Sequence, residues 1–395
     1  MTRLSIAVLA GIVIPTTACS SGGVDSILTT DLPAWTVSAE PTTVLADDGS
    51  AATMFTMIQT ARLPNGDLLV ADRGSKELRI FRDGALVTRL SRQGDGPGEL
   101  QDLSRIAVSG DTIVVIPIPM VSREVSTFTS AGGFVSRRRL RPGAGGPTVT
   151  PIGLLSTGEF LVEEGRGMRA FNEVPPLGEL IPDSVTIGLL RQPGSDSVGE
   201  YHPLGRWLRW SMVAHRVEGL PIPFNMARVA LGPMSYWTAS GPLVWVVDGA
   251  TGGVRAFDGT GAQMVNGMLP VRPAPLDART SQRSRDLALA RAATAFDSAA
   301  VTAGHDAALL PANLPVLDAI QAGHDGELWV RLFALEPGST REYLVVNRSG
   351  ETIARVAVPS DLFIHQIGPD YILGVRRDAD GVETVVEYGL RRGAE

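Results

Sequence analysis

Short apolar runs separated by turn signals recur along most of this chain. The clearest set lies at 57–90, where the runs MIQTARL and DLLVAD flank Pro-Asn-Gly, and ELRIFR and ALVTRL flank Asp-Gly. Asn-Gly and Asp-Gly tolerate the positive φ angles of tight hairpins. Four alternating strands joined by such turns predict one small antiparallel unit, which cannot bury both of its faces alone.

Similar units follow, each with a turn, an apolar strand, a polar turn and a second alternating strand, and in the fourth unit MARVALG at 226–232 is expected to be the first strand. The second strands of the units are expected to begin near Asp67, Thr112, Glu159, Pro242, Glu327 and Tyr371. Three of the gaps between them are about 45 residues, which matches the period of propeller blades, and the other two are about twice as long.

The two long gaps are interpreted as insertions at about 193–225 and 272–315. The second contains a helical pattern near 275–303, with Asp277 as a starting residue and Gly304 as a stop. This interpretation predicts six blades, and the alternative, in which each long gap hides a blade, predicts eight.

The last unit has only three strands, and the N-terminal segment 35–47 is expected to supply the fourth. Closing a ring in this way removes an exposed sheet edge. The sequence therefore predicts an all-β fold, a six-bladed β-propeller that forms a single domain over 35–392.

Two segments carry a resemblance to a known group. LPNGDLLVADRGSKELRIF at 63–81 and QGDGPGEL at 93–100 resemble the six-bladed propellers of the NHL-repeat and TolB-like type, which recur in secreted bacterial proteins and lipoproteins. The resemblance implies the fold and export, and it names no substrate because this fold hosts many unrelated activities.

The N-terminus has the layout of a secretion signal. Residues 1–18 contain a single charge at Arg3, an apolar run and then small residues before Cys19, the only cysteine. Thr-Thr-Ala-Cys at 16–19 resembles the lipobox of bacterial lipoproteins, with Thr16 where Leu is usual. We expect acylation of Cys19, a tether at 19–34, and a membrane-anchored protein in the periplasm or at the outer membrane; the alternative is an ordinary cleaved signal.

Charge limits the range of partners. The formal net charge is −7 and Lys76 is the only lysine. Nucleic acid is not expected as a partner, because phosphate binding needs a basic face. The lipid bilayer, reached through Cys19, and a protein or glycan ligand are the partners that remain.

Carboxylates at the ends of second strands are the candidate metal ligands. If Asp72, Glu163 and Asp248 converge at one rim, their oxygens would suit a hard divalent cation such as Ca²⁺. The comparison with metal-dependent gluconolactonase-type propellers suggests this site, although their ligand pattern is not matched residue by residue. The alternative is that these residues only form turns.

An aromatic and basic stretch lies inside the first insertion. Trp207, Arg209 and Trp210 could form a ligand platform, since exposed Trp and Arg favour recognition, or they could be the core of the insertion itself. The five histidines are scattered without metal-ligand spacing and are expected to be surface or core residues.

No catalytic residue is assigned, because the sequence has no nucleophile elbow, zinc-protease helix or dinucleotide loop. The favoured function is a binding or scaffold module for a protein, peptide or glycan. The alternative is a divalent-metal-dependent hydrolase or lactonase with its site at the central channel. A quinone-cofactor propeller is a third candidate, and it is disfavoured because the repeat typical of that class is absent.

Overall fold

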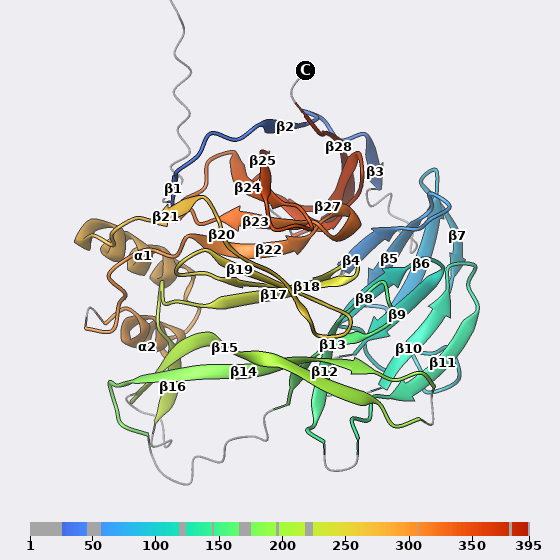
Figure 1. The fold of residues 1–395 in the computed structure, drawn as a ribbon, viewed down its shortest axis with the longest axis horizontal. Helices are drawn as coiled ribbons and strands as arrows, with labels where there is room; N and C mark the ends of the chain where they lie inside the picture. The colour runs from blue at the N-terminus through green and yellow to red at the C-terminus, as the bar shows by residue number, and fades with distance from the viewer. Residues whose placement is uncertain are drawn as a thin grey trace, which may run out of the picture.

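The fold is built mainly of antiparallel β-sheets arranged around the middle of the molecule (Figure 1). The computed structural model describes residues 26–45, 57–117, 124–143, 146–165, 175–194, 197–217, 224–306, 308–378 and 381–393. The predicted signal segment and Cys19 lie outside these ranges. Neither α-helix in the described part of the chain has the length and apolar character that a membrane span requires.

The first two sheets each contain four strands that follow one another in sequence. The strands of the first are β4 (Met57–Arg62), β5 (Leu68–Asp72), β6 (Glu77–Arg82) and β7 (Ala85–Arg89). Those of the second are β8 (Arg105–Ser109), β9 (Thr112–Ile116), β10 (Glu124–Thr129) and β11 (Phe134–Arg139). Gly66, with φ 89°, and the pair Asp83 and Gly84, with φ 48° and 81°, lie in the predicted hairpin turns.

The third sheet has five strands and the fourth has four. The strands of the third are β12 (Val149–Leu154), β13 (Phe160–Glu164), β14 (Leu180–Arg191), β15 (Glu200–His215) and β16 (Asn225–Arg228). Those of the fourth are β17 (Ser235–Ser240), β18 (Leu243–Asp248), β19 (Gly253–Asp258) and β20 (Gln263–Met268).

The last sheet joins two antiparallel units through the N-terminal segment. One unit holds β22 (Leu317–Ala322), β23 (Leu328–Leu332), β24 (Thr340–Val346) and β25 (Thr352–Pro359), with the short 3-10 turn η1 (His324–Gly326). The other holds β26 (Leu362–Ile367), β27 (Tyr371–Arg377) and β28 (Glu383–Arg391).

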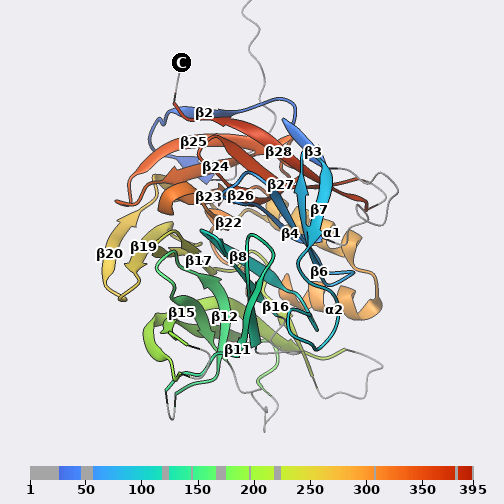
Figure 2. The ribbon, with the colours of Figure 1, turned by 90° about the vertical axis from the view of Figure 1, so that its right-hand side faces the viewer.

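The N-terminal strands β2 (Ala34–Val37) and β3 (Thr43–Leu45) both pair with β28, as the sequence predicts for this segment. Figures 1 and 2 show β2 lying beside both β25 and β28, and it pairs with β25 in parallel. The preceding β1 (Ser26–Leu28) pairs with β21 (Val271–Pro273). Residues 26–28, inside the range predicted to be a tether, therefore belong to a sheet.

The first predicted insertion, 193–225, is largely sheet. It supplies all of β15, which forms a long hairpin with β14, and β16 extends the same sheet. The prediction that MARVALG at 226–232 begins the next unit is wrong, because β16 pairs with β15 and β17 takes that place. An apolar run of this length does not reveal which neighbour it will pair with.

The second insertion contains two helices at the periphery, α1 (Ala278–Arg291) and α2 (Ala295–Gly304) (Figure 1). The helix α2 packs against β15 and β16, and α1 contacts α2. The Asp277 side chain accepts a hydrogen bond from Thr280 N and caps α1 as expected. The predicted helical pattern is interrupted because Thr294 and Asp297 form a capping box that begins α2.

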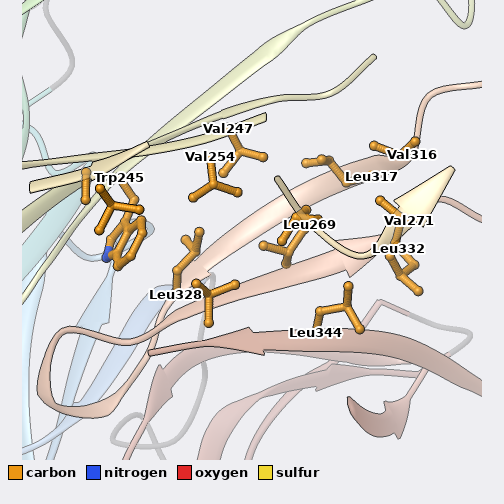
Figure 3. Packing of buried hydrophobic residues seen from close by; sticks show 14 of the residues in the cluster. Trp245, Val247, Val254, Leu269, Val271, Val316, Leu317, Leu328, Leu332 and Leu344 are labelled. Carbon is orange, nitrogen blue, oxygen red and sulfur yellow. The ribbon is translucent and has the colours of Figure 1, made fainter. Parts of the chain in front are cut away.

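The core lies between neighbouring sheets. Figure 3 shows Trp245, Val247 and Val254 from β18 and β19 facing Leu328 and Leu344 from β23 and β24. On β18 the residues between these, Val244 and Val246, pack in a different cluster against β13 and β14. The second strand of this sheet is therefore buried on both faces, which explains why its sequence is a continuous apolar run.

Candidate functional site in the central cavity

A cavity of about 750 Å³ lies at the centre of the fold. It is lined by residues of β4, β8, β12, β17, β22 and β26, the first strand of each antiparallel unit. Each of these strands has one unpaired edge in its sheet or unit. Unpaired strand edges present backbone N–H and C=O groups, so the cavity wall is polar although the sheets are largely apolar.

Hydrogen bonds join each first strand, or the turn that follows it, to the next around the cavity. Most of them connect a side chain of one strand to the backbone of its neighbour. In the first half of the ring, Gln59 accepts from Ile106 N (2.8 Å), Arg105 donates to Ile152 O, and Ser156 N donates to Gly241 O (2.8 Å). In the second half, Ser240 Oγ donates to Gly323 O (3.2 Å), Gln321 donates to His365 O (3.3 Å), and Gln366 accepts from Arg62 N (2.6 Å). The described residues thus close a ring around the cavity.

Arg105 is the only arginine among the described residues that line this cavity. Its side chain is exposed to the cavity, and one guanidinium nitrogen donates to the Ile152 carbonyl of β12. Because protein surrounds most of the guanidinium, desolvation lowers the pKa of Arg105 from its usual value, and the nearby Glu163 carboxylate partly offsets this effect. The group stays protonated at neutral pH.

Glu163 does not neutralise Arg105, because it has other partners. Its carboxylate pairs with Arg209 of β15 and accepts a hydrogen bond from Trp237 Nε1 at 3.2 Å. Among the described residues Arg105 forms no ion pair. Together these three charged groups carry a net charge of about +1 near the cavity wall.

Asp325 is the only carboxylate among the described lining residues, and it is paired with Arg348. The side chain of Asp325 is 66% exposed, which places it at the cavity rim. The cavity therefore offers one positive charge together with neutral amide, hydroxyl and imidazole groups.

His365 is a neutral member of this wall. Its Nδ1 accepts a hydrogen bond from Thr60 N at 3.1 Å, and burial lowers the pKa of His365 to about 4. A backbone N–H can only donate, so the ring carries its proton on Nε2. His365 lies at a bulge in β26, and the sequence did not indicate that it lines the cavity.

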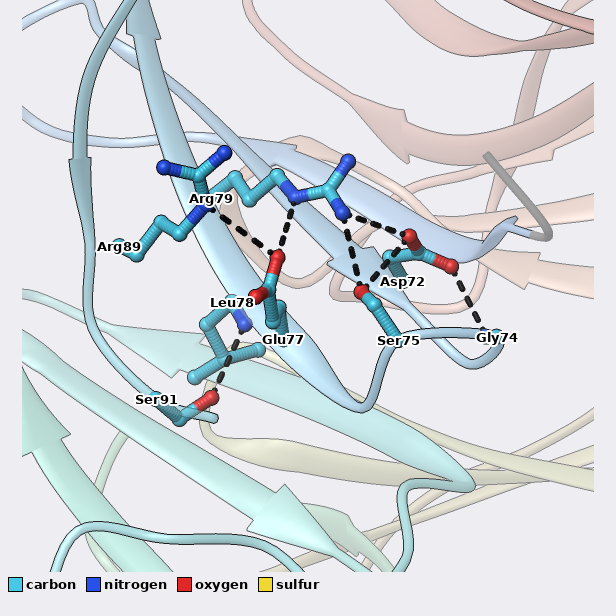
Figure 4. Close-up of polar contacts among 8 residues, drawn as sticks. All are labelled: Asp72, Gly74, Ser75, Glu77, Leu78, Arg79, Arg89 and Ser91. Atoms are coloured by element: carbon cyan, nitrogen blue, oxygen red, sulfur yellow. Dashed lines mark hydrogen bonds and ion pairs between the residues drawn. The ribbon is translucent and has the colours of Figure 1, made fainter. Parts of the chain in front are cut away.

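The three predicted metal ligands are not brought together. No group of three or more His, Cys, Asp or Glu side chains within the described ranges could hold a metal ion. Asp72 is buried at the end of β5, where it pairs with Arg79 at 3.1 Å and accepts from Gly74 N and Ser75 Oγ (Figure 4). Asp248 ends β18 and accepts from Ala250 N and Thr251 N, which is the turn-forming role considered for it.

The predicted aromatic platform divides into two parts. Arg209 and Trp210 do lie together, with the guanidinium carbon 5.3 Å from the ring centroid. Trp207 instead packs edge-on against Phe257 of β19, with ring centroids 6.1 Å apart, in the cluster between two sheets. Trp207 therefore acts as a core residue.

The residues that line the cavity were not selected by sequence reasoning. One signal could have indicated them, because Gln59, Gln321 and Gln366 each lie in the first strand of a unit, where the remaining residues are mostly apolar or small. A glutamine in a short strand is unusual unless its amide has a partner. No comparable recurring residue in the sequence indicates that Arg105 lines the cavity.

Comparisons with known proteins provide no family and no activity that can be transferred to this chain. Neither a protein-family model nor a curated protein matches it. Among solved structures, it resembles a Bacteroides fragilis protein named as a candidate for export (10% identity, 92% of this chain, 100% of that chain, TM-score 0.46).

Two enzymes are also among the similar structures. Virginiamycin B lyase from Staphylococcus aureus has 10% identity and a TM-score of 0.39, over 89% of this chain and 98% of that chain. The PQQ-bound aldose sugar dehydrogenase from Streptomyces coelicolor has 12% identity and a TM-score of 0.40, over 90% and 98%. At these identities and scores the resemblances assign no activity to this chain.

Proposed function

We propose that this protein is an exported, lipid-anchored β-propeller of six blades that acts as a binding module, with the central cavity as its ligand site. The observation that carries the proposal is the polar cavity of about 750 Å³, a volume within the range of small-molecule sites. A short peptide or a small sugar would also fit such a volume.

Six blades are supported by the arrangement of the inner strands, which are the first strands of the units, β4, β8, β12, β17, β22 and β26. Each of the six contacts the next, and the last, β26, contacts β4, so the described strands close a ring. In this count the nine-stranded sheet is two blades, bridged by the N-terminal strands that complete the last one.

The lipid anchor remains a prediction from the sequence. Cys19 precedes β1, whose pairing with β21 brings this end of the folded part close to the helical insertion. Mass spectrometry of the protein purified from membranes tests it. A diacylglyceryl mass on an N-terminal Cys19, absent from Cys19→Ser, is expected, and an unmodified N-terminus at another residue would contradict it.

A metal-dependent hydrolase is not favoured by the side chains present. Hard divalent cations prefer several carboxylate oxygens, whereas the described lining contributes Asp325, already paired with Arg348, and the cationic Arg105. The three carboxylates predicted as ligands are held by arginines or by turn backbone in their own sheets.

The test of the binding module is a variant that fills the cavity. Thr238 of β17 lines the cavity, and Thr238→Tyr would occupy part of its volume; Thr340→Tyr, at an exposed site on β24, is the matched control. Thermal unfolding is followed with a panel of small acids, sugars and tripeptides. We expect at least one class to raise the Tm of the parent and of Thr340→Tyr, with no effect on Thr238→Tyr; equal shifts in all three proteins would contradict binding in the cavity.

A further inference from the structure

We infer that the central cavity selects an organic carboxylate, whose charged group is held by Arg105. The inference rests on the proposed function and goes further by naming the ligand class and the residue that recognises it. It stands on the position of Arg105, the groups around it and the composition of the nearby wall.

Arg105 has hydrogen-bond donors left for a ligand in the described part of the chain. A guanidinium has five N–H groups in a planar fork that matches a carboxylate. Arg105 uses one nitrogen for the Ile152 carbonyl, and the structure gives its remaining donors no other partner in the described part of the chain. The Ile152 contact orients the guanidinium at the edge of the cavity, with donors left for a ligand.

The charges of the described cavity wall favour an anion. The only described lining carboxylate, Asp325, is at the rim and paired with Arg348, and Glu163 is paired with Arg209. An anion entering the cavity therefore meets an unpaired cation and no unpaired carboxylate in the described wall. Because Arg105 faces a cavity walled by protein, its attraction for an anion is stronger than that of an arginine on a flat, open surface.

Apolar side chains in the same wall favour an organic acid over an inorganic anion. Ile152 and Leu154 of β12 and Trp237 of β17 are half-buried and line the same cavity. An inorganic anion on Arg105 would leave these side chains in contact with water, whereas an apolar ligand body would cover them. The wall thus combines one anion contact with apolar surface, a pattern that fits a carboxylate carried on a hydrocarbon group.

Cyclohexanecarboxylate and its neutral analogue, cyclohexanecarboxamide, are suitable probes. Calorimetric titration at pH 8 uses the full chain with Cys19→Ser, which cannot be acylated at that position. We expect the acid to bind at least tenfold more tightly than the amide. Arg105→Gln, whose amide can still donate to Ile152 O, is expected to weaken binding of the acid about tenfold or more.

Two further variants keep the test interpretable. Arg105→Lys retains the charge without the fork and is expected to bind the acid with intermediate affinity. Arg139→Gln makes the same charge change on β11 at an exposed arginine for which the described residues provide no ion pair, and is expected to bind like the parent. Equal weakening in Arg105→Gln and Arg139→Gln would overturn the role of Arg105.

Other outcomes separate this inference from the proposed function. If sulfate binds as tightly as the acid, the organic part of the inference is overturned. If the acid and the amide bind equally, or if only a neutral disaccharide such as cellobiose binds and Thr238→Tyr abolishes it, the carboxylate class is wrong while the cavity remains a binding site.

Discussion

Thr60 N donates a hydrogen bond to Nδ1 of His365 across the junction between β4 and β26, at 3.1 Å. The bond ties the first and last inner strands together, and it requires an unprotonated Nδ1. Protonating that nitrogen would remove the acceptor and place a positive charge in a buried position. Burial accordingly lowers the pKa of His365 to about 4, from an ordinary value of 6.5.

The lowered pKa predicts a pH dependence of stability. Between pH 6.5 and about 4 the unfolded chain binds a proton at His365 that the folded protein does not bind, so the free energy of unfolding falls as the pH is lowered through this window. The loss amounts to about 3 kcal/mol at most. Urea unfolding of the parent and of His365→Asn, which keeps an acceptor without titrating, measures it; the pH slope should be shallower in the variant, and identical slopes would rule out this origin.

The buried pair of Arg79 and Asp72 predicts a large mutational effect. Both side chains are less than 5% exposed, and Arg79 also pairs with Glu77 (Figure 4). Arg79→Met leaves buried carboxylate charge without its partner and should lower the free energy of unfolding by about 3–5 kcal/mol. Arg283→Met, which breaks the exposed pair with Glu336, should change the free energy of unfolding very little. Similar losses in urea unfolding would contradict the structural role of the buried pair.

The burial of Leu45 in β3 predicts that this short N-terminal strand contributes strongly to stability. Leu45 is 4% exposed and packs in a cluster with residues of β5, β6, β27 and β28, between the first and last units. Leu45→Ala should destabilise the protein by about 2–5 kcal/mol. Leu180→Ala, at a residue that is 51% exposed, is the matched control and should have little effect. Chemical denaturation that gives the two variants equal stability would show that β3 does not hold the ring closed.

Because the Glu163 carboxylate lies near Arg105, removing its charge is predicted to change the affinity for an anion. In Glu163→Gln the amide oxygen can still accept from Trp237 Nε1, while the negative charge near Arg105 is lost. Affinity for cyclohexanecarboxylate should rise several-fold at low ionic strength and fall back as salt screens the charges. Glu336→Gln, in the exposed pair with Arg283, serves as the control. Unchanged or weaker binding in Glu163→Gln would argue against an anion at Arg105.

Much of the secondary structure follows from local properties of the sequence. The second strand of every unit lies where its apolar run predicts it, for example β18 over Leu243–Asp248 and β23 over Leu328–Leu332. The Asn-Gly and Asp-Gly pairs form the predicted turns because glycine accepts positive φ at little cost. Asp277 begins a helix because its carboxylate can accept a free backbone N–H.

The sequence did not predict every pairing between strands that are far apart in the chain. The run MARVALG at 226–232 has the apolar pattern of a first strand, yet part of it joins β15 in the preceding sheet. Alternation fixes which face of a strand is buried, but not the partner that will cover that face. The strand β15, which pairs with β14, accordingly lies in the range 193–225 that is interpreted from the sequence as an insertion.

The sequence by itself determined the repeating strands and their turns, because these depend on neighbours close in the chain. It also indicated the segment that completes the last unit, because that unit lacks a strand that the other units have. Only the tertiary structure decided which side chains meet. It separated Asp72, Glu163 and Asp248 by giving each its own hydrogen-bond or ion-pair partners, and it placed Arg105 and His365 around one cavity although 260 positions separate them in the chain. Such groupings arise from the closure of the ring, a long-range event that no local pattern encodes.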